Sequence, residues 1–210
     1  YLSRAAYKLI EIDERKKVLR PGDRVLDCGA APGSWLQVAA SRVGTAGVVV
    51  GIDLQPIKFR AANVKTVEGD FTQVPPDQLL ALAAGDRRGR SAAHFDVILS
   101  DMAPSTSGDP GGDHHRSVRL CESVLDRCGE LLKPGGNLVM KVFEGEAYPE
   151  LLKRIASMFD RCKGYKPKAS RSESAEMYIV ATEFKPVAND EGPSAPAQSV
   201  RKRSAGWGTQ

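Results

Sequence analysis

VLDCGAAPGSW, residues 25–35, passes from a short apolar run that contains Asp27 to a loop of small residues and then to a helical pattern. A strand, tight loop and helix in this order are typical of the first unit of a nucleotide-type α/β domain, whose ligands lie beyond the carboxyl ends of the strands. Gly29 and Gly33 permit the unusual backbone angles and the close ligand approach that such a loop needs. The G-x-G-x-x-G spacing of dinucleotide-binding loops is missing, which argues against an oxidoreductase and against a pyrophosphate ligand.

Apolar runs and helical patterns alternate along the chain on both sides of this stretch. The expected strands cover residues 24–27, 47–52, 64–67, 95–100, 138–143, 162–165 and 176–184. The expected helices cover residues 3–19, 34–42, 77–84, 114–132 and 149–159, with turns at 21–22 and 133–136 and with Ser3 and Asp113 as caps. Such alternation predicts an α/β fold with a mostly parallel sheet that helices cover on both faces.

The composition is that of one folded domain followed by a polar tail. With 210 residues, of which 41% are hydrophobic and 27% charged, the chain can bury a sizeable core. From about residue 187 onward, Ala, Pro, Ser, Gly and charged residues replace the periodic apolar pattern. We therefore expect a domain over residues 1–186 and a disordered tail over residues 187–210.

Charge and cysteine content restrict the partners and the compartment. A net charge of +4 and a pI of about 8.9 are compatible with a polyanionic partner. No apolar run approaches the roughly 18–20 residues of a membrane span, and no signal peptide is visible, although the chain opens on Tyr1. The four cysteines form no C-x-x-C pair, which favours free thiols in a reducing compartment over zinc or disulfides. We therefore expect a protein without membrane association.

Three acids follow three successive expected strands. Asp53 comes twenty residues after Gly33 at the end of the second strand, where an acid accepts hydrogen bonds from ribose hydroxyls. Asp70 follows the third strand, where it can meet an adenine amino group, and Asp101 follows the fourth. One such acid alone is as readily a loop carboxylate or a helix cap. Together with the glycine loop, the three predict a ligand with a ribose, a base and a positive group such as a sulfonium or an amine.

Lys141 interrupts the apolar run 138–143, which otherwise has the pattern of a buried strand. Lysine is rarely buried without a partner. One interpretation is a lysine near the strand end whose stem is buried and whose amine reaches water. The interpretation that we favour is a lysine in a pocket that accepts a proton during catalysis.

Asp113, His114 and His115 form the one grouping that suggests a metal site. A helix start with Asp113 as its cap explains the same three residues and is the interpretation that we favour. We expect no metal.

Several separated motifs share a resemblance to one enzyme family. They are SRAAYKL at 3–9, DCGAAPGSW at 27–35, SDMAP at 100–104, KVFEGE at 141–146 and SAEMYIVA at 174–181. In this order and spacing the chain resembles the FtsJ/RrmJ family of S-adenosylmethionine-dependent RNA ribose 2′-O-methyltransferases over about residues 3–184. The resemblance implies a Rossmann-like class I methyltransferase fold, with seven mostly parallel strands and an antiparallel last strand.

The resemblance also implies the site residues. The family's Lys-Asp-Lys-Glu tetrad corresponds to Lys8, Asp101, Lys141 and Glu176, and S-adenosylmethionine contacts correspond to Gly33, Trp35, Asp53, Asp70 and Asp101. Without it, Lys8 would be taken for a helix-surface lysine, Glu176 for a strand-edge acid and Trp35 for a packing residue. The chain departs from the family at Ser105, where the family often has Asn.

The roles that we assign to the tetrad follow from this correspondence. Lys141 is the general base, or the group that steers a lone pair of the ribose 2′-oxygen. Asp101 orients Lys141 and lies near the sulfonium. Lys8 repels a charged Lys141, and Glu176 positions Lys8 or the ribose. No metal is needed, because the leaving group is already activated by its positive charge.

The compact chain resembles the ribosomal members of the family. This implies a uridine in the A-loop of large-subunit ribosomal RNA, presented by an assembled or nearly assembled subunit. The alternatives are a tRNA anticodon-loop methyltransferase and a non-catalytic assembly factor that binds cofactor and RNA. We expect a monomer in the cytoplasm, or in mitochondria if the chain is from a eukaryote.

RNA binding is expected to depend mainly on contacts between basic side chains and phosphates. The candidates are Arg4, Arg15, Lys16, Lys17, Arg20, Lys58, Arg60, Lys166, Lys168 and Arg171. Each alone is more readily a solvated surface charge, so the prediction is that several of them share the face that carries Lys141.

Overall fold

The fold is given by a computed structural model that describes residues 1–84, 94–170 and 174–186. The expected tail over 187–210 lies outside the described residues. The strands are β1 (Arg24–Cys28), β2 (Val48–Asp53), β3 (Val64–Glu68), β4 (Phe95–Ser100), β5 (Leu132–Phe143), β6 (Phe159–Tyr165) and β7 (Glu176–Phe184). The helices are α1 (Ala5–Lys16), α2 (Ser34–Val43), α3 (Pro76–Ala84), α4 (Pro110–Asp126), α5 (Cys128–Leu131) and α6 (Tyr148–Met158).

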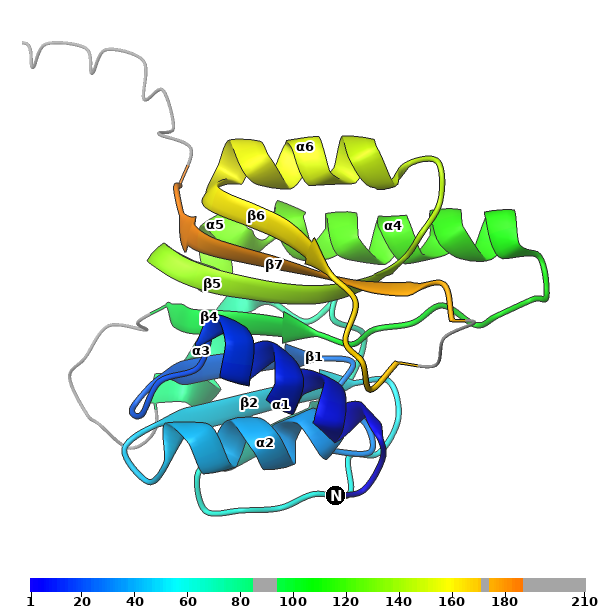
Figure 1. The fold of residues 1–210 in the computed structure, drawn as a ribbon. Helices are drawn as coiled ribbons and strands as arrows, with labels where there is room; N and C mark the ends of the chain where they lie inside the picture. The colour runs from blue at the N-terminus through cyan, green and yellow to red at the C-terminus, as the bar shows by residue number, and fades with distance from the viewer. Residues whose placement is uncertain (85–93, 171–173, 187–210) are drawn as a thin grey trace, which may run out of the picture.

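The strands form a seven-stranded sheet in the order β3-β2-β1-β4-β5-β7-β6 (Figure 1). The pairs among β1 to β5 are parallel, whereas β7 runs antiparallel to both of its neighbours, β5 and β6. The predicted α/β fold with an antiparallel last strand is therefore confirmed.

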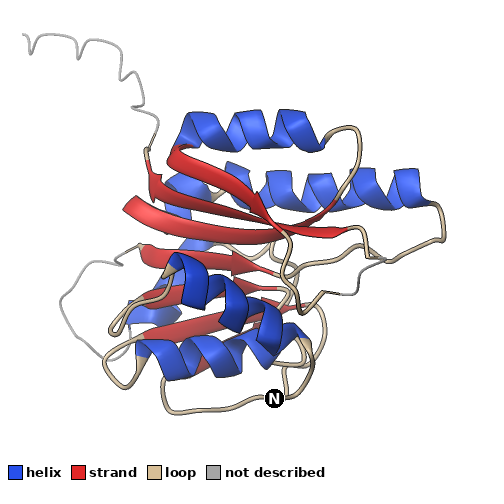
Figure 2. Ribbon diagram, viewed as in Figure 1, coloured by secondary structure: helices blue, strands red, loops and turns tan. Residues whose placement is uncertain are grey.

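Helices cover both faces of the sheet, as the alternating pattern predicts (Figure 2). One apolar cluster joins α1 and α2 to one face, and a second joins α3, α4, α5 and α6 to the other. Val25 and Leu26, which are successive in β1, belong to different clusters. Because both faces are buried, the inner strands have continuous apolar runs instead of alternating apolar and polar residues.

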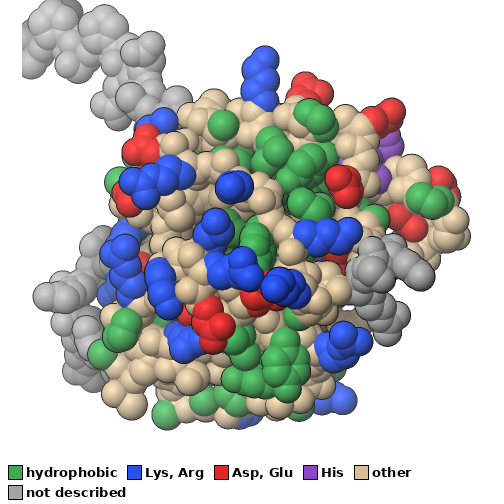
Figure 3. Space-filling view, viewed as in Figure 1, with side chains coloured by type: hydrophobic (Ala, Val, Ile, Leu, Met, Phe, Trp, Pro, Cys, Tyr) green, Lys and Arg blue, Asp and Glu red, His purple; other side chains and the backbone are tan. Residues whose placement is uncertain are grey.

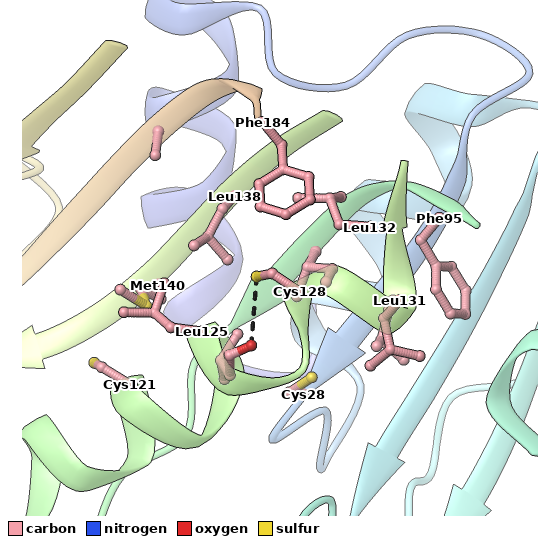
Figure 4. Packing of buried hydrophobic residues seen from close by; sticks show 14 of the residues in the cluster. Cys28, Phe95, Cys121, Leu125, Cys128, Leu131, Leu132, Leu138, Met140 and Phe184 are labelled. Carbon is pink, nitrogen blue, oxygen red and sulfur yellow. Dashed lines mark hydrogen bonds between the residues drawn. The ribbon is translucent and has the colours of Figure 1, made fainter. Parts of the chain in front are cut away.

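All four cysteines are free thiols, as expected. Cys28, Cys121 and Cys128 lie in the cluster beneath α4 and α5, where they pack against apolar side chains (Figure 4). Burial raises the pKa of Cys121 and of Cys128 to about 12, so these thiols remain protonated and pack as small apolar groups. None of the helices in the described ranges is long and apolar enough to cross a membrane.

The first predicted helix is too long at its carboxyl end. We expected it to reach residue 19, but α1 ends at Lys16. The next residue, Lys17, takes the left-handed conformation at φ 53°, and its N–H donates to the Asp13 carbonyl. The helix begins at Ala5 with Arg4 as its cap, so Ser3 is not the cap that we expected, although its hydroxyl accepts the N–H of Ala5 at 3.2 Å.

The fourth long helix begins before the expected position. We expected it to cover 114–132 with Asp113 as its cap, but α4 starts at Pro110. The cap is Asp109, whose carboxylate accepts the N–H of Gly112 at 3.1 Å, and Pro110 at the first helical position needs no hydrogen-bond partner. Asp113 instead accepts the N–H of Ser107 at 3.0 Å and forms an ion pair with Arg116.

The expected helix over 114–132 is also too long at its carboxyl end, because α4 ends at Asp126. The short helix α5 follows α4, and β5 already begins at Leu132. The expected turn at 133–136 therefore lies inside β5, where the register with β4 shifts. In the same way, β6 begins at Phe159 instead of residue 162.

Candidate active site

Three carboxylates lie at one edge of the sheet, because β1, β2 and β4 are parallel neighbours. Asp53 is the last residue of β2, and Asp101 directly follows β4. Asp27 lies inside β1, where it is in register with Gly51 and Leu99. The structure thus brings together Asp53 and Asp101, as predicted, and adds Asp27.

Asp27 is fully buried, and neither of its carboxylate oxygens has a hydrogen-bond partner among the described residues. Burial raises the pKa of Asp27 well above its usual range, and the charges of Asp101 and Asp53 raise it further. A buried carboxyl without a partner is uncommon, and strongly shifted acids concentrate at functional sites. We did not include Asp27 among the predicted site residues, although an acid within an apolar strand was a visible signal.

Asp53 anchors the loop that follows β1. Its Oδ2 accepts the N–H of Ala31 at 2.9 Å, and its Oδ1 accepts the N–H of Gln55 at 2.8 Å. Each carboxylate oxygen can accept a second hydrogen bond. Asp53 can therefore hold the loop and still bind a hydroxyl group.

The glycines of this loop are required by the packing of the chain itself. A Cβ on Gly29, at φ +77°, would lie 2.8 Å from the backbone nitrogen of Met102. A Cβ on Gly33, at φ +121°, would lie 2.4 Å from the Cβ of Phe59. We expected glycine here to allow a ligand to come close, but the close neighbours in the structure are Met102 and Phe59. The cofactor contact assigned to Gly33 stays a prediction.

Asp70 lies two residues beyond the end of β3, which is the outermost strand next to β2. It is exposed, and its Oδ1 accepts both the N–H and the hydroxyl of Thr72 at 2.8 Å. The turn after β3 therefore holds this carboxylate in place. Its contact with an adenine amino group stays a prediction.

Lys141 lies on β5 with only 8% of its surface exposed. Its Nζ donates to the backbone carbonyl of Asp101 at 2.8 Å and lies 3.0 Å from Oδ1 of the same residue. The amine is therefore held by two oxygens of the loop after β4. This geometry agrees with the expected role of Asp101 in orienting Lys141.

Lys8 and Glu176 form an ion pair at 2.6 Å, although 168 residues separate them in the chain. Burial alone would raise the pKa of Glu176, but the hydrogen bond and charge of Lys8, together with the charge of Lys141, lower it below its usual value. The structure thus brings all four tetrad residues together. Because Glu176 compensates the charge of Lys8, the repulsion of Lys141 that we expected from Lys8 is weakened.

Tyr178 connects the members of the tetrad, and the sequence did not lead us to it. Its hydroxyl donates to Oδ1 of Asp101 at 3.1 Å, and the Nζ of Lys8 lies 5.9 Å from the centre of its ring. Burial, followed by the charges of Asp101 and Glu176, raises the pKa of Tyr178, so its hydroxyl stays protonated and donates. The signal was its position two residues after Glu176, because alternate residues of a strand lie on the same face.

Trp35 packs α1 against the rest of the domain. The indole is 2% exposed, its N–H donates to the carbonyl of Ala5 at 2.9 Å, and its ring lies 5.8 Å from that of Tyr178. The structure thus gives Trp35 the packing role that the sequence alone suggests. Its contact with the cofactor stays a prediction.

A polar cleft of about 280 Å³ opens beside the Lys8–Glu176 pair. It is lined by Arg4, Ala5, Lys8, Ala169, Ser174 and Glu176. Two of these residues belong to the tetrad, and Arg4 adds an exposed cation at the rim. The cleft is therefore suited to a polar, negatively charged substrate next to the tetrad.

The remaining predicted positions lie in the loop after β4 and on α4. Ser105, where the family often has Asn, is exposed in the loop between β4 and α4. His114 is buried, whereas His115 is exposed and pairs with Glu146 at 3.0 Å. No group of three or more His, Cys, Asp or Glu side chains in the described part of the chain could hold a metal ion.

Comparison with known proteins agrees with the motifs. The model of the FtsJ-like methyltransferase family matches residues 1–184. A protein of Syntrophobacter fumaroxidans named ribosomal RNA large subunit methyltransferase E is 45% identical over 181 residues, which are 86% of this chain and 88% of that protein. A protein of the same name from Methanothermobacter thermautotrophicus is 45% identical over 186 residues, covering 88% of this chain and 85% of that protein.

Solved structures share the fold. A Plasmodium falciparum protein described as a ribosomal RNA methyltransferase has a TM-score of 0.75 and 30% identity, covering 88% of this chain and 98% of that one. Fibrillarin of Aeropyrum pernix, solved with natively bound S-adenosyl-L-methionine, has a TM-score of 0.59 at 16% identity, with 85% and 74% covered. The sheet order, the assembled tetrad and a family model that spans nearly every described residue lead to one conclusion: the chain belongs to the FtsJ-like methyltransferase family.

Proposed function

We propose that this protein transfers the methyl group of S-adenosylmethionine to a ribose 2′-hydroxyl in large-subunit ribosomal RNA. The observation that carries the proposal is the buried Lys141, held by Asp101 beside the Lys8–Glu176 pair. Relatives that are 45% identical and named ribosomal RNA large subunit methyltransferase E support the substrate class. Within that class we propose a uridine of the A-loop, in an assembled or nearly assembled subunit in the cytoplasm.

The residues at the sheet edge fit this methyl donor. Asp27 offers two buried oxygens without partners, which suit an ammonium or another hydrogen-bond donor. Asp53 keeps acceptor capacity for ribose hydroxyls, and Asp101 supplies negative charge near a sulfonium. We propose that Gly33, Trp35 and Asp70 complete the contacts. When bound here, S-adenosylmethionine supplies a methyl group that its sulfonium already activates.

The side chains of the tetrad prepare the attacking oxygen. A ribose 2′-hydroxyl is a weak nucleophile until its proton is removed or tightly hydrogen-bonded. Lys141, in its neutral form, accepts that proton at Nζ, and the two oxygens of Asp101 fix the direction of the amine. Lys8 and Glu176 hold the substrate ribose in the adjoining cleft.

Two other functions remain open to test. A tRNA anticodon-loop methyltransferase would use the same tetrad on another RNA. A non-catalytic assembly factor would bind cofactor and RNA without transfer, but a lysine held by two oxygens of an aspartate favours catalysis.

One experiment distinguishes these functions. The protein is incubated with labelled S-adenosylmethionine and, separately, with large subunits, free ribosomal RNA and tRNA from a strain that lacks the modification. We expect label in the large subunit only, at a ribose 2′-oxygen of an A-loop uridine. Label in tRNA alone would favour the tRNA enzyme, and cofactor binding without any transfer would favour the assembly factor.

RNA is proposed to bind across a basic surface formed by α1 and the segment around the end of β6. Lys and Arg side chains gather on this face of the molecule (Figure 3). At the end of α1, Cζ of Arg15 lies 5.7 Å and Nζ of Lys16 lies 5.9 Å from the ring centre of Tyr165 on β6. The hydroxyl of Tyr165 donates to Glu11 at 2.6 Å, which fastens the ring to the helix. Tyr165 thus gathers two exposed cations on the helix that carries Lys8.

The other candidates differ in their surroundings. Exposed Arg4, Lys166 and Lys168 lie on or next to the basic surface. The guanidinium of Arg60 donates to the carbonyls of Ile57 and Phe59, so it braces its own loop. Arg171 lies outside the described residues. Lys17, Arg20 and Lys58 are exposed, and their contacts with RNA stay predictions.

Replacing Arg15 and Lys16 by alanine should weaken RNA binding and make it less salt-dependent. The slope of log K against log salt is negative, and each lost phosphate contact makes it shallower by about 0.7 for a single strand. The slope of the double variant should therefore be shallower by about 1.4. Binding is measured by fluorescence anisotropy over a series of salt concentrations. The control is Lys65→Ala with Lys153→Ala, which removes two exposed lysines on β3 and α6. An equal loss of slope in both double variants would contradict the location of the RNA surface.

A further inference from the structure

Strand β5 extends beyond its parallel neighbour. The last residues in register between β4 and β5 are Ser100 and Met140, after which the chain leaves β4 toward Asp101. β5 continues to Phe143, still paired on its other side with β7 up to Glu176. The segment 141–143, which begins with the catalytic lysine, therefore has one side that β4 does not pair.

Side chains of α4 take the place of the missing strand. The thiol of Cys121 donates to the carbonyl of Lys141 at 3.2 Å. The hydroxyl of Ser117 accepts the N–H of Phe143 at 3.0 Å, and Nδ1 of His114 lies 2.7 Å from the carbonyl of Phe143. His114, Ser117 and Cys121 are spaced three and four residues apart, so they lie on one face of the helix. We call these three residues the α4 stripe.

The contacts of His114 define its tautomer and connect β5 to the loop before α6. The N–H of Ala147 donates to Nε2 of His114 at 3.0 Å, so Nε2 is the acceptor and the proton is on Nδ1. Nδ1 therefore donates to the carbonyl of Phe143. A Cβ on Gly145 would lie 2.4 Å from the imidazole ring, so the loop between Phe143 and Ala147 closes tightly over it. One imidazole thus fixes the end of β5 and the start of α6.

The same segment also supports the second ion pair of the site. The N–H of Glu144 donates to the carbonyl of Ala175 at 2.8 Å, directly before Glu176. Phe143 is in register with Glu176 across the β5–β7 pair. The backbone that the α4 stripe holds is therefore next to two members of the tetrad, Lys141 and Glu176.

We propose that the α4 stripe is a positioning device for Lys141. It holds the backbone of residues 141–143 in the extended form after β4 has ended, and it does so from the helix that packs on the face opposite α1. Lys141 directs its side chain to the α1 face, where Asp101 binds the amine. The stripe fixes the lysine backbone and Asp101 fixes its amine, so both ends of the side chain are constrained. The proposal rests on the proposed function of Lys141 as the group that prepares the 2′-hydroxyl.

The chain contains a matched pair of serines for the test. Ser117 and Ser123 both lie on α4, and their hydroxyls donate to the carbonyl three residues earlier, at 2.8 and 2.7 Å. Only Ser117 also accepts the N–H of Phe143. Ser117→Ala and Ser123→Ala therefore remove the same local hydrogen bond, and only Ser117→Ala removes the contact with β5.

Methyl transfer is measured with saturating RNA and S-adenosylmethionine at a temperature where both variants are folded, together with cofactor affinity. We expect kcat of Ser117→Ala to fall by about tenfold to 100-fold, because small misplacements of a reacting group have effects of this size. Ser123→Ala should stay within about twofold of the unmodified protein. Cofactor affinity should be unchanged in both, because the cofactor contacts lie on other strand ends. A purely structural role would lower thermal stability and leave kcat of the folded variant intact.

A double-mutant cycle tests whether the effect passes through Lys141. In a Lys141→Ala background, measured under single-turnover conditions, Ser117→Ala should cause no further loss. Cys121→Ala, which removes the donor to the Lys141 carbonyl itself, gives a second variant should Ser117→Ala not fold, and the same loss of kcat is expected. A folded Ser117→Ala or Cys121→Ala with normal kcat, or an equal loss with and without Lys141, would overturn the positioning role. A fully active Lys141→Ala variant would instead contradict the proposed function of Lys141. Failure of the positioning role and failure of the proposed function therefore give different results.

Discussion

Replacing Lys141 by alanine is expected to lower kcat for methyl transfer by about 10²–10⁴-fold, the usual contribution of a positioned general acid or base. The amine that we propose as the acceptor of the 2′-hydroxyl proton is lost, whereas the carboxylate of Asp101 keeps its hydrogen bond from Tyr178 at 3.1 Å. The proposed cofactor residues Asp27, Asp53 and Asp70 belong to other strand ends, whereas Asp101 contacts the deleted amine. S-adenosylmethionine should therefore bind with nearly normal affinity, which isothermal titration calorimetry measures.

The control for this variant is Lys153→Ala, which removes an exposed lysine on α6, on the opposite face of the sheet. It makes the same change in net charge and should leave kcat within about twofold. A Lys141→Ala variant that binds both substrates and keeps its rate within a few-fold would remove Lys141 from the catalytic machinery. Loss of cofactor binding in that variant would instead indicate that the lysine has a structural role.

Replacing Asp27 by asparagine is expected to increase the free energy of unfolding, relative to the unmodified protein, as the pH rises, even though we propose Asp27 as a cofactor contact. The pKa of Asp27 is raised in the folded protein by burial and by its acidic neighbours. Between the unfolded value of about 3.9 and the raised value, the folded protein holds a proton that the unfolded chain releases, so stability falls as the pH increases. The amide does not titrate, so the free energy of unfolding of the variant, relative to that of the unmodified protein, should increase with pH.

Thermal unfolding of both proteins between pH 5 and pH 8 measures this effect. The difference in melting temperature between Asp27→Asn and the unmodified protein should grow with pH. The control is Asp77→Asn, which changes an exposed acid on α3. Its free energy of unfolding should stay within about 0.5 kcal/mol of that of the unmodified protein at every pH. We also expect weaker binding of S-adenosylmethionine to Asp27→Asn. A difference in melting temperature that stays constant or shrinks between pH 5 and pH 8 would contradict the raised pKa of Asp27 in the folded protein.

The sequence predicted those features that depend on short segments. Continuous apolar runs identify the strands, and the acids after them identify the edge of the sheet, because parallel strands place their carboxyl ends together. Asp53 ends β2 and Asp101 follows β4, as expected. The family motifs supplied Lys8 and Glu176, which no local pattern would have indicated.

The boundaries and the detailed contacts depend on distant residues. The carboxylate of Asp109 and the left-handed Lys17 decide where α4 begins and where α1 ends, and neither interrupts the apolar periodicity. The indole of Trp35 on α2 lies next to the ring of Tyr178 on β7, at a sequence separation that no window of residues spans. The partners of Phe143 on α4 depend on where β4 ends, which only the paired strands reveal.

The place of β7 in the sheet has a consequence for the newly made protein. β7 lies between β5 and β6, so among the described strands β6 joins the sheet through β7, which follows it in the chain. The same strand carries Glu176 and Tyr178, which meet Lys8 and Asp101 from earlier parts of the chain. A growing chain on the ribosome can therefore build the cofactor edge of β1 to β4 first, because amino-terminal segments fold as they emerge. Under the proposed function, methyl transfer requires the insertion of β7, so an incomplete chain would bind the methyl donor without being able to use it.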